Sequence, residues 1–174
     1  WGSEGTGDGK LTYPYGIAID SSNNVYVTEE GADRINNQVQ KFDSDGNFLL
    51  KWGSNGTGNG ELDGLFGIAI DSSNNVYVTE YTENTRVQVF DSNGNFLAKW
   101  DDDIKIPQPE YIAIDSSDNV YVGDSGYRIQ KFDSDGNLLS TLGGESQGTG
   151  NGEFTNPNGM IVDSSDNLHV VDTS

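Results

Sequence analysis

The sequence has no cysteine and only one histidine, His169. The absence of cysteine excludes disulfide bonds and thiol chemistry. A single histidine cannot build a zinc site of several histidines, so we do not expect catalytic zinc in this chain. No apolar run approaches the roughly 20 residues that a membrane-spanning helix requires, so we expect no insertion into a membrane.

Basic residues are also scarce. Nine Lys and Arg stand against 28 Asp and Glu, which gives a formal net charge of −19. A surface of this sign repels phosphate backbones and anionic membranes, so we do not expect nucleic acid as a partner. The carboxylates either attract cations and basic partners or are simply solvated, and charge alone does not choose between these interpretations.

Glycine is abundant, with 23 residues, and Asn, Asp and Ser occur in dense clusters, a composition typical of short strands joined by tight turns. One short element recurs along the chain. It reads GIAID at 16–20 and 67–71, YIAID at 111–115 and GMIVD at 159–163, with offsets of 51, 44 and 48 residues. A period in this range, with several strands in each unit, predicts propeller blades.

Each unit carries further strand signals, rich in β-branched and aromatic residues. The second strand is expected at 24–29, 75–80, 119–124 and 167–172, the third at 38–43, 86–91 and 128–133, and the fourth at 47–52, 95–100 and 137–142. The turns between them need left-handed residues, which Gly and, less readily, Asn and Asp can supply. We assign these positions to Asn23, Gly46, Asn74, Gly94, Asp118, Gly136 and Asp166.

Strand order, spacing and turn residues together resemble the NHL repeat. This resemblance implies an all-β fold, a β-propeller of four-stranded antiparallel blades, usually six in a ring. We expect a partial propeller over 1–174, with blade 1 at about 15–53, blade 2 at about 66–101, blade 3 at about 110–143 and half of blade 4 at about 158–172. Because six blades need roughly 280 residues, we expect the remaining blades in a longer chain, or an assembly with other copies.

An acid ends the second strand of every unit: Glu29, Glu80, Asp124 and Asp172. Propeller geometry would bring these four side chains to the ligand-binding face near the central channel. One hypothesis is that they are metal ligands for a hard cation such as calcium. The alternative, which the NHL resemblance implies, is that the acids pair with nearby arginines, Arg86 and Arg128.

The first blade departs from this pattern, since Gln38 stands where the other blades have arginine and the preceding loop is longer. Glu29 therefore lacks its expected partner. We expect a binding loop here, formed by Glu30, Gly31, Ala32, Asp33 and Arg34.

Three further features have structural interpretations. Trp1, Trp52 and Trp100 recur at one position of the outermost strand, which predicts packing between blades, with a carbohydrate-stacking platform as the alternative. The glycine-rich linkers at 5–9, 56–60 and 148–152 lack the context of a phosphate-binding loop and are expected to be flexible connectors. His169 replaces a tyrosine of the other blades and is expected to pack within a strand.

The sequence contains no recognisable catalytic set. We therefore expect a noncatalytic binding or assembly scaffold that presents a propeller loop face to a protein, peptide or glycan, in an extracellular or cell-surface setting. The alternative is a lactonase- or lyase-like enzyme with a divalent cation in the propeller channel.

Overall fold

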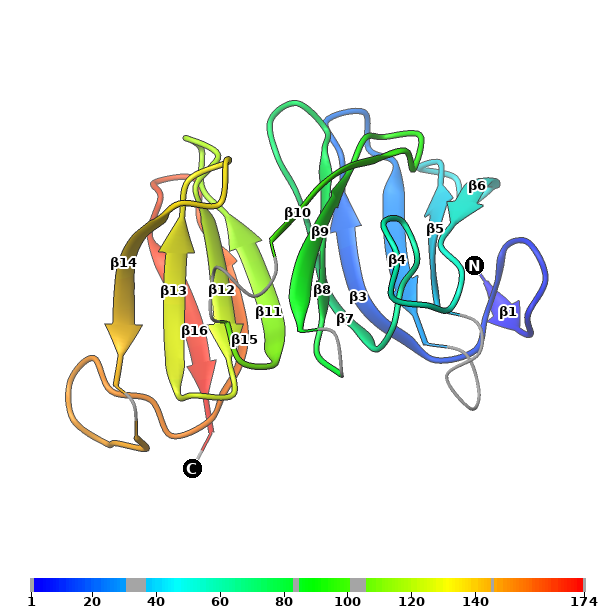
Figure 1. The fold of residues 1–174 in the computed structure, drawn as a ribbon. Helices are drawn as coiled ribbons and strands as arrows, with labels where there is room; N and C mark the ends of the chain where they lie inside the picture. The colour runs from blue at the N-terminus through cyan, green and yellow to red at the C-terminus, as the bar shows by residue number, and fades with distance from the viewer. Residues whose placement is uncertain (1, 31–36, 83–84, 101–105, 145, 174) are drawn as a thin grey trace.

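The structure is a computed structural model that describes residues 2–30, 37–82, 85–100, 106–144 and 146–173. All regular elements in these ranges are β-strands (Figure 1). The described part of the chain holds no helix that could span a bilayer. The expected all-β fold is thus confirmed.

Three four-stranded antiparallel sheets follow one another along the chain, and a two-stranded sheet follows them. Blade 1 contains β3 (Pro14–Ile19), β4 (Val25–Glu29), β5 (Gln38–Phe42) and β6 (Phe48–Trp52). Blade 2 contains β7 (Leu65–Ile70), β8 (Val76–Glu80), β9 (Arg86–Phe90) and β10 (Phe96–Trp100). Blade 3 contains β11 (Pro109–Ile114), β12 (Val120–Asp124), β13 (Arg128–Phe132) and β14 (Leu138–Gly143), and blade 4 contains β15 (Pro157–Val162) and β16 (Leu168–Asp172). A short parallel pair, β1 (Ser3–Glu4) and β2 (Lys10–Leu11), precedes them.

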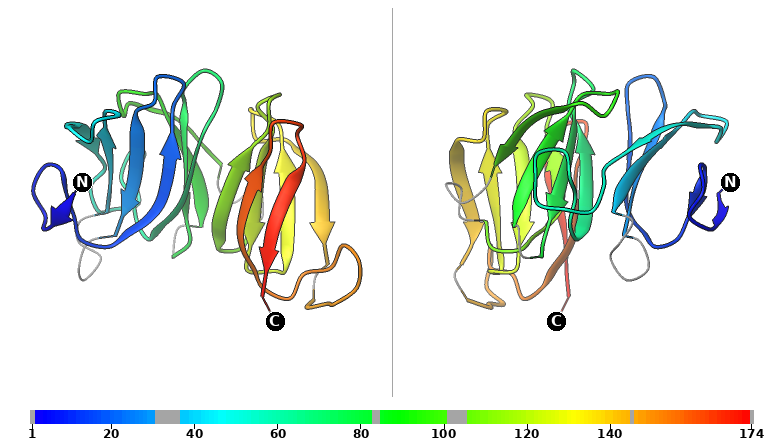
Figure 2. Two further views of the ribbon diagram at one scale, coloured as in Figure 1. Left: turned by 180° about the vertical axis from the view of Figure 1, so that it is seen from behind. Right: turned by 45° about the vertical axis from the view of Figure 1, so that its right-hand side comes forward.

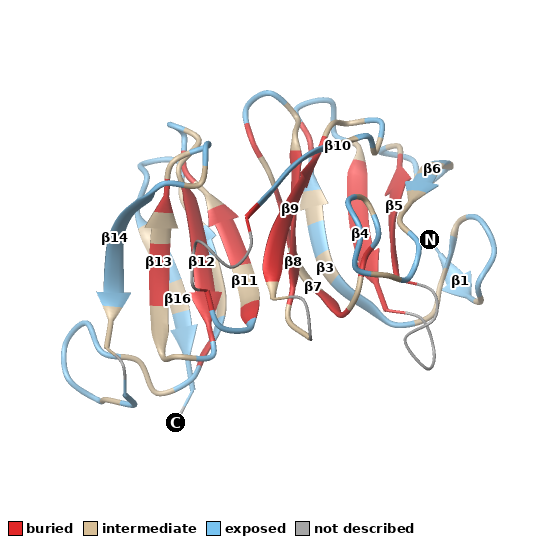
Figure 3. Cartoon of the chain, viewed as in Figure 1, coloured by how far each residue is buried: buried red, intermediate tan, exposed pale blue. Residues whose placement is uncertain are grey.

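The blades stack face to face, so the first strands β3, β7, β11 and β15 lie in series (Figures 1 and 2). Blade 2 lies between blades 1 and 3, and the segment around Gly9 and Leu11 covers part of the outer face of blade 1, so the middle strands of both blades are buried on both sides. Strands β4, β5, β8 and β9 are buried along their whole length (Figure 3). Most of the hydrophobic core therefore lies between the blades, and a smaller cluster of Val25, Val27 and Phe42 lies on the outer side of blade 1 against Leu11.

Apolar side chains stay exposed on β3 at one end of the stack and on blade 4 at the other. Ile17 in β3 is 66% exposed, whereas Ile68, at the same repeat position in β7, is 6% exposed. On the opposite outer face, Ile161 and Val171 are 65% and 61% exposed. The same repeat position is thus core or surface according to whether a neighbouring blade covers it.

The turns follow the predicted left-handed geometry. The seven residues assigned to these positions, Asn23, Gly46, Asn74, Gly94, Asp118, Gly136 and Asp166, all have φ between 60° and 86°. An aspartate at the start of each turn stabilises it: the carboxylate of Asp20, for example, accepts hydrogen bonds from the backbone N–H groups of Ser22 and Asn24. Such Asx turns fix the hairpin register.

Hydrogen bonds also join the first hairpin of each blade to the first hairpin of the next. A serine donates both its backbone N–H and its hydroxyl to the Asn or Asp side chain that sits at positive φ in the following blade, at 2.6–3.1 Å. The pairs are Ser21 with Asn74, Ser72 with Asp118 and Ser116 with Asp166. We call these contacts hairpin latches.

Tryptophans of the fourth strands pack on the next blade, as the packing interpretation predicts. The Trp52 ring lies 5.9 Å from that of Phe90 in blade 2, and the Trp100 ring lies 5.7 Å from that of Phe132 in blade 3. A Cβ atom on Gly94 would lie 2.7 Å from the Trp52 ring. Glycine is therefore needed at this position both for its positive φ and for the close approach of the Trp52 ring. Trp1 lies outside the described residues.

Candidate functional site: the loop face of the blades

The strand register brings the four predicted acids to one end of the molecule. In each blade the last residue of the second strand pairs with the first residue of the first strand: Pro14 with Glu29, Leu65 with Glu80, Pro109 with Asp124 and Pro157 with Asp172. The linkers between blades and the loops between second and third strands meet at this same end. We call it the loop face.

Glu80 in blade 2 is completely buried and has donors on both carboxylate oxygens. Arg86 Nε donates to Oε2 at 2.6 Å and Arg86 Nη2 donates to Oε1 at 3.2 Å. Gln88 Nε2 donates to Oε2 at 2.8 Å, and the N–H of Asp63 donates to Oε1 at 2.8 Å. Burial raises the pKa of the Glu80 carboxyl, and the Arg86 guanidinium opposes this rise.

Arg86 also holds the glycine-rich linker that precedes blade 2. Its guanidinium donates to the carbonyl oxygens of Thr57 at 2.8 Å and Glu61 at 2.9 Å. The Glu61 carboxylate in turn accepts the N–H of Gly58 at 2.8 Å. The expectation of a flexible connector is therefore wrong for this linker, because a buried side chain from the third strand binds its carbonyl groups.

Blade 3 repeats the arrangement with a shorter acid. Arg128 Nε donates to Asp124 Oδ2 at 2.6 Å, Gln130 Nε2 donates to the same oxygen at 2.9 Å, and the N–H of Gly126 donates to Oδ1 at 2.7 Å. The pairing of acid with arginine that the NHL resemblance implies is thus confirmed in blades 2 and 3.

Blade 1 replaces the guanidinium with an amide. Glu29 is 1% exposed and accepts hydrogen bonds from the side chains of Gln38 and Gln40 and from the N–H of Thr12. In the predicted binding loop, Glu30 is buried and its N–H donates to the Tyr13 carbonyl at 3.1 Å. Gly31, Ala32, Asp33 and Arg34 lie outside the described residues.

Asp172 in blade 4 is exposed and accepts the N–H groups of Thr155 and Asn156 at 2.7–3.0 Å. Each of the four acids therefore binds donors of its own blade or linker. Among the residues that the structure describes, no group of three or more His, Cys, Asp or Glu could hold a metal ion. Calcium binding by Glu29, Glu80, Asp124 and Asp172 stays a prediction.

A recurrent feature of the third strands was not identified from the sequence: a glutamine stands two residues after the position of Gln38, Arg86 and Arg128 in each complete blade. Gln40, Gln88 and Gln130 each donate to the acid of their own blade. In blades 1 and 2 the amide also donates to a linker carbonyl, that of Lys10 or Glu61, at 2.6 Å. Its recurrence in the third strand of all three complete blades is the signal that could have identified it.

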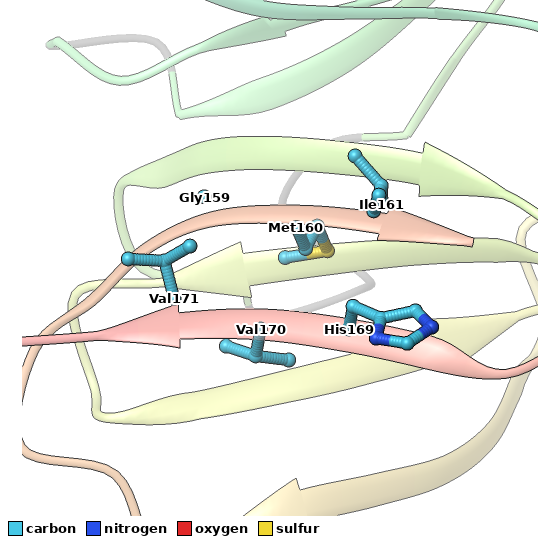
Figure 4. A pocket seen from close by; sticks show the side chains of 6 residues that line it. All are labelled: Gly159, Met160, Ile161, His169, Val170 and Val171. Atoms are coloured by element: carbon cyan, nitrogen blue, oxygen red, sulfur yellow. The ribbon is translucent and has the colours of Figure 1, made fainter. Parts of the chain in front are cut away.

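A hollow of about 360 Å³ lies on β15 and β16, lined by Gly159, Met160, Ile161, His169, Val170 and Val171 (Figure 4). The hollow is apolar, and it belongs to the outer face of blade 4. His169 lies in a strand, as predicted, but its side chain is exposed. Its Nε2 contacts Asp163 at 2.9 Å, as the Tyr26 hydroxyl contacts Asp20 in blade 1.

Two repeat families match separate parts of the chain: the beta-propeller repeat over residues 4–28 and the NHL repeat over residues 67–90. Protein lin-41 of Caenorhabditis elegans is 53% identical over 51 residues, which are 29% of this chain and 4% of that protein. The RING finger protein nhl-1 of the same organism is 38% identical over 69 residues, 40% of this chain and 7% of that protein. The E3 ubiquitin-protein ligase TRIM71 of Rattus norvegicus is 43% identical over 51 residues, 29% of this chain and 6% of that protein. The chain thus spans a small part of each relative.

Solved structures share the fold over most of this chain. A gluconolactonase from Xanthomonas campestris has a TM-score of 0.67 at 15% identity, covering 97% of this chain and 57% of the other. A protein of unknown function from Bacteroides caccae has a TM-score of 0.61 at 12% identity, covering 91% of this chain and 53% of the other. At such identities the likeness shows the fold alone.

Proposed function

We propose that this chain, in which an NHL repeat matches residues 67–90, is a noncatalytic binding module that presents its loop face to a protein, peptide or glycan. One observation carries this proposal. The acids best placed to act in catalysis or metal binding are engaged by their own blades, and in blade 2 the same network binds the adjoining linker. In blade 2 the Arg86 side chain thus holds the linker that contains Thr57 and Glu61.

The loops between second and third strands differ in length from blade to blade, which suits recognition. Eight residues, 30–37, join the second and third strands of blade 1, whereas residues 81–85 and 125–127 do so in blades 2 and 3. Variable loops on a rigid scaffold are the usual place for binding residues.

Replacing residues 30–37 with the three-residue connection of blade 3, 125–127, tests the proposal. The native protein and this variant would be applied to peptide and glycan arrays, and hits would be measured by calorimetry. We expect the native protein to bind at least one class of ligand and the variant to lose at least one such ligand while its thermal unfolding stays cooperative.

The matched control changes the opposite end of the same blade. Ser44→Ala lies in the turn between β5 and β6 and should retain all binding. If the native protein bound no peptide, protein or glycan, or if loop replacement and Ser44→Ala had equal effects, the proposal would fail.

The enzyme alternative requires a cation on the loop face. Calorimetric titration with calcium tests it directly, since saturable binding that Glu80→Gln abolishes would favour a lactonase- or lyase-like site. Likeness to the gluconolactonase, at 15% identity, supports no more than the shared fold.

A further inference from the structure

Four aromatic side chains from three successive blades meet at the loop face. We call Tyr15, Phe66, Tyr81 and Tyr111 the aromatic cluster. The Phe66 ring is central: its centroid lies 5.4 Å from that of Tyr15, 5.6 Å from that of Tyr81 and 5.1 Å from that of Tyr111. The rings of Tyr81 and Tyr111 stand nearly perpendicular to it, at 86° and 85°.

The cluster is accessible. Tyr15 is 50% exposed, and the other three side chains are partly buried. Phe66 directly follows Leu65, which pairs with Glu80, so the rings lie beside the network of acids and linkers. This position separates the cluster from the core between the blades.

Glu110 flanks the cluster in sequence, since it directly precedes Tyr111. Glu110 lies in β11 and is partly buried. Within the described residues, no hydrogen bond or ion pair engages its carboxylate. Burial raises the pKa of the Glu110 carboxyl, and burial together with the Glu110 charge raises the pKa of the Tyr111 hydroxyl.

Elsewhere in the protein, two lysine ammonium groups each lie over an aromatic ring and beside a carboxylate. Lys131 Nζ lies 4.7 Å above the centre of the Tyr121 ring and 2.9 Å from the Asp115 carboxylate. Lys41 lies 4.8 Å above the Tyr26 ring and 3.7 Å from the carboxylate of Asp20. An aromatic face and a carboxylate together attract an organic cation. At the loop face Phe66 and Tyr111 supply the rings and Glu110 the carboxylate, and in the described part of the chain no lysine or arginine forms an ion pair with Glu110.

We propose that the aromatic cluster and Glu110 bind a lysine or arginine side chain of a peptide segment in a partner protein. This inference rests on the proposed function and specifies its ligand. The net charge of −19 favours the approach of such a basic segment over longer distances.

Fluorescence anisotropy with a labelled peptide of alternating glycine and lysine tests the inference. A peptide with norleucine in place of lysine retains the aliphatic stem and lacks the charge. We expect Glu110→Gln and Tyr111→Leu each to weaken binding of the lysine peptide about five-fold or more. Tyr111→Phe, which keeps the ring, should bind like the native protein.

Asp45→Asn is the matched control, because it removes one negative charge from an exposed turn at the opposite end of the molecule. We expect this change to have less than half the effect of Glu110→Gln. Thermal unfolding of every variant would show that folding is retained.

Any of the following results would overturn the inference. Equal weakening by Glu110→Gln and Asp45→Asn would indicate diffuse attraction, and equal binding of the norleucine peptide would indicate an apolar site. A native protein that binds a neutral glycan or peptide through residues 30–37 but not the lysine peptide would keep the proposed function and refute this ligand. Failure of every ligand class would refute both.

Discussion

Three equivalent acids have three different partners. Glu29 binds the amides of Gln38 and Gln40, Glu80 binds a guanidinium that is 4% exposed, and Asp124 binds one whose side chain is 23% exposed. Taking charges out of water is costly, and a buried charge that loses its partner is strongly destabilising. The contribution of each acid to stability therefore depends on its own blade.

Arg86→Met should lower the free energy of unfolding by about 3–5 kcal/mol, because it leaves Glu80 buried without its countercharge. Arg128→Met should cost less, because the Arg128 side chain is 23% exposed and water can take its place beside the buried Asp124 carboxylate. Arg86→Gln is the matched control, because an amide can donate to Glu80 as Gln38 donates to Glu29. Urea unfolding would measure all three changes, and equal losses for the two methionine variants would contradict this explanation.

Stability should also depend on pH through Asp115. Burial alone would raise the pKa of Asp115, but hydrogen bonds from Asn119 and Lys131 outweigh this effect and lower it to about 2, from an ordinary value of 3.8. A carboxyl whose pKa is lower in the folded state stabilises the fold above its unfolded pKa and loses this effect as the pH falls. The loss should therefore occur between about pH 4 and pH 2.

Urea unfolding at several pH values in this window would test the dependence on Asp115. The native protein should lose more stability between pH 4 and pH 2.5 than Asp115→Asn, which cannot titrate. Parallel curves for the two proteins would show that Asp115 does not contribute.

Sequence reasoning identified the acids and two of their arginines because both recur at fixed positions in the repeat. It did not identify the aromatic cluster, since Tyr111 stands where blade 2 has Gly67 and therefore interrupts the pattern. Phe66, Tyr81 and Tyr111 come together only through the stacking of blades 2 and 3. Contacts of that kind leave no periodic signal.

Strands and turns were predictable because their local chemistry suffices. Alternating valine and tyrosine fit a pleated strand, and Gly, Asn or Asp at a left-handed position fits a tight hairpin. The linker before blade 2 was not predictable, because its carbonyl groups bind Arg86, which lies 25 residues beyond Glu61 in the chain. A glycine-rich segment can adopt many backbone conformations, and contacts with side chains distant in sequence select one of them.

Gly94→Ala should destabilise the protein through two effects. Its φ of 81° costs an alanine about 1–2 kcal/mol, and the new methyl group would displace the Trp52 ring. Gly152→Ala is the control, since its φ of 79° is similar and nothing lies within 4 Å of the added atom. Thermal unfolding should show a larger loss for Gly94→Ala, and identical losses would mean that the Trp52 contact yields without cost.

Across the whole molecule, burial is decided by neighbours. Ile17 and Ile68 both occupy the second position of an identical GIAID sequence, so no local pattern distinguishes them. The fold class followed from the repeat, but the exposed apolar faces of blades 1 and 4 could be assigned only from the stack. The number of blades in a complete ring stays a prediction.

Ile68→Ala should lower the free energy of unfolding by about 2–5 kcal/mol, because it opens a cavity between blades 1 and 2. Ile17→Ala, the same change in the same sequence context, should cost less than about 1 kcal/mol in this chain because its side chain is mostly in water. Urea unfolding of the two variants would compare them. A cost for Ile17→Ala equal to that for Ile68→Ala would mean that another surface covers β3 in solution.

The hairpin latches bear on how such a chain can change its length during evolution. In the middle blades one short hairpin carries both halves of the contact, with Ser72 as donor and Asn74 as acceptor. A duplicated blade would therefore bring a matching donor and acceptor with it, and its neighbours would need no compensating change. Gene segments that encode whole blades could be gained or lost by unequal recombination while each junction keeps its hydrogen bonds.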